Sequence, residues 1–185
     1  MARRPSKYIK RTLDLRAKLW PDLDDKIYWN RKRYNGFVTV PRTMSLVMSI
    51  IDDLTKGKPA SSTYFELWCR AYDEMYVSLS KSKELAFQSG FIGQRAERTW
   101  ADRIKMLDEL GFISVRSGAA GALSHAVILN PHLVIKRLYA EGRTGIMESK
   151  YNALIERGNE IGADDLDIEI PVSEVSVDLE DEIPF

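Results

Sequence analysis

One set of polar and basic residues has the types and spacing needed to hydrogen-bond bases and bind phosphates: Gln94, Arg95, Arg98 and Lys105. On a helix over residues 94–110, with about 100° between successive residues, the three cations share one face and Gln94 joins the first turn. Gln and Arg side chains can hydrogen-bond to the edges of adenine and guanine, and Arg also binds phosphates. The pattern therefore predicts contact with nucleic acid, and the alternative is a charged face that is only solvated.

The opposite face of the same helix predicts how it is held. Ala96, Trp100, Ile104 and Leu107 recur at helical spacing, so we expect them to lie against a hydrophobic core. Gly111 follows the last apolar residue, and glycine ends many helices at that position. The helix is therefore expected to turn its cations toward solvent.

A shorter helix is predicted before this one and a β-hairpin after it. The shorter helix covers residues 82–88, and Gly90 in the turn that follows can take a positive φ. Residues 112–116 alternate like a strand, and residues 125–129 return as a second strand after a loop rich in Gly and Ala. This order is typical of a winged helix-turn-helix. Arg116, the basic residue nearest the hairpin loop, is a further candidate for DNA contact.

The junction between the long helix and the hairpin carries a resemblance. Residues 99–113, with Leu107, Leu110, Gly111 and Phe112, resemble the junction between recognition helix and wing in many bacterial winged-helix proteins. The fold class expected is mainly α with a small β-hairpin wing: a winged helix-turn-helix with extra N- and C-terminal helices and a flexible acidic tail.

The chain of 185 residues, 44% of them hydrophobic, is long enough for one good core. Three regions are expected: a basic N-terminal helical arm (1–40), a winged-helix core with appended C-terminal helices (41–160), and an acidic tail with a docking tip (161–185). The further helices expected in the core cover residues 41–54, 61–79, 132–141 and 145–160.

The net charge of zero conceals a strong asymmetry along the chain. The first 42 residues hold twelve Lys or Arg and four Asp, whereas residues 160–185 hold ten acidic residues and no basic one. The basic end, with helices expected over 6–20 and 24–34, favours nucleic acid as a partner, and the acidic end favours a basic protein. The acidic tail folding back over the arm is a competing idea. The arm's candidate DNA contacts are Arg3, Arg4, Arg31, Lys32 and Arg33.

The last five residues suit docking into a protein pocket. Phe185 offers a ring for an apolar pocket and a terminal carboxylate for a cation at its mouth. Pro184 biases Ile183 toward an extended form, so less entropy is lost on binding. Asp181 and Glu182 add attraction to a basic rim, which makes binding sensitive to salt. The alternative is a solvated acidic tail.

This end resembles the C-terminal tip of bacterial single-stranded DNA-binding protein, an acidic stretch that ends in Asp-Ile-Pro-Phe. Glu182 stands where that family has Asp, and the resemblance covers only about the last eight residues. It implies a host partner among the proteins that bind that tip: the polymerase III χ subunit, exonuclease I, RecQ, PriA, RecO or primase.

Together these features predict a DNA-binding protein of a bacterial mobile element, such as a plasmid, that recruits host replication or repair proteins through its tip. Whether it prefers single- or double-stranded DNA is left open, and so is a homodimer. One alternative is a winged-helix transcriptional repressor whose tail solubilises or autoinhibits it. Another is an adaptor that binds no DNA and competitively blocks host proteins that recognise the tip.

We predict no catalytic site, metal site or cofactor, and therefore no enzyme. His125 and His132 have no Cys or paired acidic residues at the spacing of metal ligands, and both are expected to be structural or surface residues. Cys69 excludes an internal disulfide and, within an aromatic helical stretch, is expected to be buried. No run of eighteen apolar residues is present, so a cytoplasmic bacterial protein without a membrane span is expected.

Overall fold

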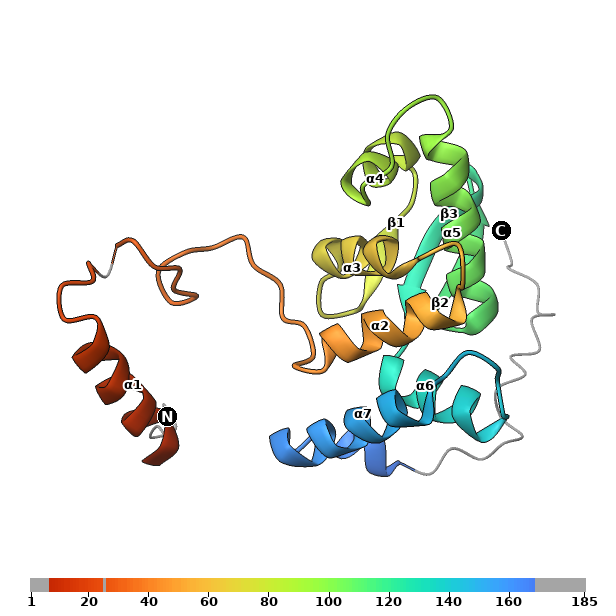
Figure 1. Ribbon diagram of the computed structural model, residues 1–185. Coiled ribbons are helices and arrows are strands. Elements are labelled where there is room, and N and C mark those ends of the chain that lie inside the picture. Colours follow the sequence, from red (N-terminus) through yellow and green to blue (C-terminus); the bar gives the residue numbers. More distant parts are fainter. Residues whose placement is uncertain (1–6, 25, 169–185) are drawn as a thin grey trace. The chain divides into compact units, whose positions relative to one another are not determined.

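The computed structural model describes residues 7–24 and 26–168. The chain divides into two compact units, the first ending at Phe37 and the second beginning at Val38 (Figure 1). The first unit contains helix α1 (Lys7–Leu19). Much of its apolar surface remains open, with Ile27, Trp29 and Trp20 all more than half exposed.

The second helix predicted for the first unit, over 24–34, is wrong, because this stretch forms turns. The Asp24 carboxylate accepts a hydrogen bond from the Lys26 amide at 2.9 Å, and the Asn30 side chain accepts one from the Lys32 amide at 2.9 Å. Such local side-chain bonds offer the backbone an alternative to the helix. Trp29 then meets Phe37 edge to face, with 5.7 Å between ring centroids.

The second unit is mainly α-helical with a small antiparallel sheet, which confirms the coarse fold class. Figure 1 shows α4 and α5 at one end of this unit and α6 and α7 at the other. Within the described residues its helices are α2 (Met44–Leu54), α3 (Ser61–Arg70), α4 (Ser82–Gln88), α5 (Ala96–Leu110), α6 (Pro131–Ala140), α7 (Glu148–Ile161) and the short 3-10 helix η1 (Asp164–Asp167).

The sheet has three strands in the order β1-β3-β2: β1 (Tyr76–Ser78), β2 (Ile113–Gly118) and β3 (Gly121–Ile128). The predicted hairpin is therefore present, with a tighter turn between its strands than expected. The helix predicted to reach residue 79 is wrong, because α3 ends at Arg70 and β1 follows. Met75 takes a positive φ of 56°, and Val77 pairs with Ala126 of β3.

The core lies among α2, α3, α5 and the sheet. Tyr64 of α3 and Phe112, just before β2, are fully buried and meet edge to face with 5.6 Å between ring centroids. Cys69 lies on the outer side of α3 and is exposed, so the prediction of a buried thiol is wrong. Tyr64 and Trp68 point into the core, whereas Phe65, one helical turn before Cys69, is exposed on the same side as the thiol.

The C-terminal helices pack on α2. Tyr139 of α6 and Tyr151 of α7 stack with 3.8 Å between ring centroids. Leu166 of η1 is buried, and the Lys136 ammonium donates to the carbonyls of Leu166 and Ile168 at 2.8 and 2.9 Å. Residues 161–168 were expected to begin the flexible tail, but they are packed structure. Residues 169–185 lie outside the described part.

Candidate nucleic-acid interface

The turn between α4 and α5 sets how α5 is presented. Ala86 of α4 is fully buried, and the Phe91 amide donates to its carbonyl at 3.0 Å. Gly90 and Gly93 take φ values of +90° and +84°, a region that glycine enters without the steric cost that a side chain brings. The positive φ predicted for Gly90 in this turn is confirmed.

The buried and exposed faces of α5 are those predicted. Trp100, Ile104 and Leu107 are buried, and Ala96 is half-buried. The four predicted contact residues are all exposed, and none forms an ion pair with any residue that the structure describes: Gln94, Arg95, Arg98 and Lys105. The helix begins two residues later than predicted, so Arg95 is its N-cap and Gln94 lies in the preceding turn. The structure therefore places Arg98 and Lys105 on the exposed face of α5, with Arg95 exposed at its N-cap and Gln94 exposed in the turn before it.

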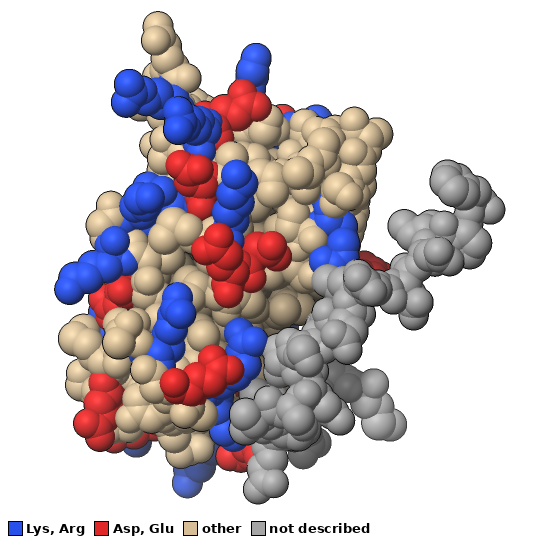
Figure 2. All heavy atoms as spheres, turned by 90° about the vertical axis from the view of Figure 1, so that its right-hand side faces the viewer, with Lys and Arg blue, Asp and Glu red and all other residues tan. Residues whose placement is uncertain are grey.

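The charge around α5 is mixed. Glu97 and Asp102 are exposed on the same helix, and Ser82 donates a hydrogen bond to Glu97. On the face drawn in Figure 2, Lys and Arg side chains alternate with Asp and Glu and form no continuous basic patch. Arg103 is engaged in an intramolecular hydrogen bond, because its Nε donates to the Pro59 carbonyl at 3.0 Å. Binding of a phosphate backbone here would rest on a few cations.

The hairpin places Arg116 beside the turn, but the side chain is engaged with its own strand. Its Nη1 donates to Ser114 Oγ at 3.2 Å and to the Val115 carbonyl at 2.8 Å. Gly118 lies against the end of the His125 side chain, and a Cβ there would come 2.4 Å from Nε2, so a larger residue would require His125 to move. His125 in turn lies 2.8 Å, through Nδ1, from the Tyr76 hydroxyl, so it is a structural histidine, as predicted.

The remaining predicted DNA contacts lie in the first unit. Arg31 lies over the Phe37 ring at 5.6 Å, and Arg31, Lys32 and Arg33 are all exposed. This cluster belongs to the first unit, whereas α5 belongs to the second. Arg3 and Arg4 lie outside the described residues, as do the predicted partner-binding residues Asp181, Glu182, Ile183, Pro184 and Phe185.

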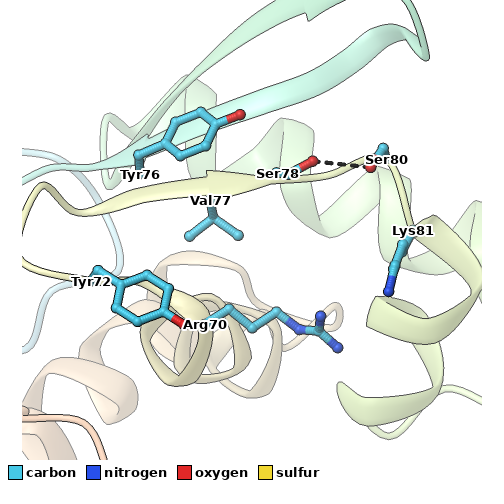
Figure 3. A pocket seen from close by; sticks show the side chains of 7 residues that line it. All are labelled: Arg70, Tyr72, Tyr76, Val77, Ser78, Ser80 and Lys81. Atoms are coloured by element: carbon cyan, nitrogen blue, oxygen red, sulfur yellow. Dashed lines mark hydrogen bonds between the residues drawn. The ribbon is translucent and has the colours of Figure 1, made fainter.

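A hollow of about 310 Å³ beneath the edge strand β1 is lined by two basic residues, Arg70 and Lys81. In Figure 3, Arg70 extends along it toward Lys81, and Val77 points into it from β1. The Arg70 guanidinium is bound by Glu66 at 2.6 Å and Glu84 at 2.8 Å. Its charge is therefore neutralised within the fold, and the hollow offers little to an anion.

A hydrogen-bonded series that the sequence did not reveal joins α2, α6 and η1. Thr43 Oγ1 lies 2.6 Å from His132 Nε2, and His132 Nδ1 lies 2.8 Å from the Asp165 carboxylate. Partial burial acts to raise the pKa of Asp165, but hydrogen bonds from Asn130 and His132 outweigh it and lower the pKa. Both ring nitrogens of His132 are therefore engaged, Nε2 with the Thr43 hydroxyl and Nδ1 with the Asp165 carboxylate.

Hydroxyl, imidazole and carboxylate in series are the parts of a nucleophilic triad. Thr43 is only 1% exposed, however, so its hydroxyl is closed to a substrate. The series instead fixes the start of α6 against α2 and η1, which agrees with the structural role predicted for His132. No spacing signal could have found it, because its members are far apart in sequence.

Within residues 7–24 and 26–168, no group of His, Cys, Asp and Glu is arranged to hold a metal ion. No helix of that part is long and apolar enough to cross a membrane. In comparisons with protein-family models, curated proteins and solved structures, nothing matches the chain.

Proposed function

We propose that residues 61–128 form a winged helix that binds DNA through the exposed face of α5. The observation that carries the proposal is the set Gln94, Arg95, Arg98 and Lys105, held outward on a helix whose other face is buried. The element order α3-β1-α4-α5-β2-β3 with sheet order β1-β3-β2 supports it, since it puts a helix-turn-helix ahead of a two-stranded wing.

The chemistry of these side chains supports DNA as the ligand. Arg95 and Arg98 have no ion-pair partner among the described residues, so no intramolecular bond has to break before they bind phosphate. Gln94 precedes the first turn of α5, the part of a recognition helix that reaches base edges in the major groove. Arg116 would join them by leaving its own strand.

Fluorescence polarisation of labelled duplex and single-stranded oligonucleotides, repeated over a range of salt concentrations, tests this function. We expect binding at low salt that weakens as salt rises, because each phosphate contact releases condensed counterions. If Arg95, Arg98 and Lys105 each contact a phosphate, the slope of log affinity against log salt should lie between about −2 and −3. If the protein binds neither the duplex nor the single-stranded oligonucleotides at low salt, the proposed function is wrong.

We also propose that the acidic end, which lies outside the described residues, docks a host protein that recognises the single-stranded DNA-binding protein tip. This part rests on the sequence Asp181-Glu182-Ile183-Pro184-Phe185. A peptide of residues 177–185 should bind one of the proteins named above, and binding should weaken with salt and be lost without Phe185. The same peptide with an amidated end measures the part played by a free carboxylate. If none of these proteins binds it, the tail is only a solvated segment.

A further inference from the structure

The turn between α4 and α5 carries an apolar hollow of about 410 Å³ that reaches from α4 to the start of α5. Phe87 and Ile92 line it and are 69% and 81% exposed. A large exposed apolar side chain is common singly, whereas adjoining exposed apolar side chains are typical of binding surfaces.

The rim of this hollow is polar and partly cationic. Lys83 of α4 and Gln94 line it, and both are exposed. Arg95 follows Gln94 directly and is also exposed. Lys83, like Arg95, has no ion-pair partner among the residues that the structure describes. Glu97 also lines the hollow, and the hydrogen bond from Ser82 holds its carboxylate.

We propose that this hollow receives an unpaired base, so that the protein prefers single-stranded or forked DNA to a blunt duplex. The inference rests on the proposed function and names the DNA class that the same surface takes. The Phe87 ring supplies a face on which a base stacks, Ile92 supplies a second apolar contact, and Lys83 and Arg95 attract the phosphates on either side.

Two features favour an unpaired base over other occupants. In a duplex the faces of the bases are covered by their neighbours, so an exposed ring beside cations gains little from duplex DNA. A protein partner with an apolar side chain would fit Phe87 and Ile92 but would leave two cations without a counter-charge. A nucleotide fits both the apolar pair and the cations, because it joins a base with an apolar face to an anionic phosphate.

The test compares three DNA molecules on the full-length protein: a single-stranded oligonucleotide, the blunt duplex with its complement, and a fork with unpaired arms. Each strand carries 2-aminopurine, whose fluorescence changes on stacking. Phe87→Ala should weaken single-strand and fork binding about 5- to 150-fold, the range for loss of one stacked base, and leave duplex binding nearly unchanged. Tyr72→Ala is the matched control, because Tyr72 is an aromatic residue of α3–β1 that is 82% exposed.

The outcomes separate this inference from the proposed function. A single-strand preference that Phe87→Ala removes, together with loss of the 2-aminopurine change, supports it. Equal weakening on all three DNA molecules, or no weakening on any, overturns it while leaving DNA binding by α5 in place. Failure of the wild-type protein to bind any of the three overturns both. Thermal melting of each variant shows whether it is folded.

Discussion

The double variant Arg95→Glu, Arg98→Glu is expected to lose DNA affinity by about 100-fold or more while melting at nearly the wild-type temperature. Loss of an arginine contact to DNA costs about 1–3 kcal/mol, and each reversed charge adds repulsion from the phosphates. Both side chains are exposed and unpaired within the described residues, so folding should lose little. The two positions are neighbours on one helix, so their effects need not add.

The measurement is fluorescence polarisation against salt concentration, with a control of equal charge change. Arg42→Glu, Arg143→Glu alters net charge by the same amount at two exposed positions outside α5. If α5 is the interface, the α5 variant loses DNA affinity, and its slope of log affinity against log salt becomes shallower by about 2. The control variant should change the affinity and the slope only modestly. Equal losses in the two variants would mean that net charge alone governs binding, and the α5 assignment would be wrong.

Helices α4 and α5 and the β2–β3 hairpin were predictable because their signals are local. Apolar residues at helical spacing and the glycine that ends α5 define this helix within one stretch of sequence. Gly111 is the C-cap of α5 and takes φ = 80°. The Phe112 amide then donates a hydrogen bond to the Leu107 carbonyl at 2.9 Å, and this bond fixes the direction in which the chain enters β2. The exposed set Gln94, Arg95, Arg98 and Lys105 follows from the same periodicity.

The elements that were missed depend on contacts distant in sequence. β1 has three residues, and it is a strand because Val77 pairs with Ala126 about fifty residues later. The series Thr43–His132–Asp165 likewise joins three separate elements. The hollow beside Phe87 was missed for another reason: an apolar residue in a short helix is normally assigned to the core. Positions where a sequence-based assignment to the core fails are often functional sites.

Phe112→Ala is expected to lower the free energy of unfolding by about 3–5 kcal/mol, the cost typical of a buried Phe. The side chain is fully buried against Tyr64, and its carbonyl accepts from the Leu129 amide at 3.0 Å. It therefore joins α3 to the point where α5 passes into β2. Loss of the ring would leave a cavity in the part of the core that sets the direction of α5.

Urea unfolding followed by circular dichroism measures this change. The midpoint should fall with little change in the slope of the transition, because the native and unfolded surfaces stay similar. Phe112→Leu, which keeps most of the apolar volume, should cost much less, and Phe87→Ala should stay within about 0.5 kcal/mol because that ring is already exposed. A Phe112→Ala protein as stable as wild type would mean that α3 does not support the α5–β2 junction. The orientation of α5, on which the interface depends, would then need another source.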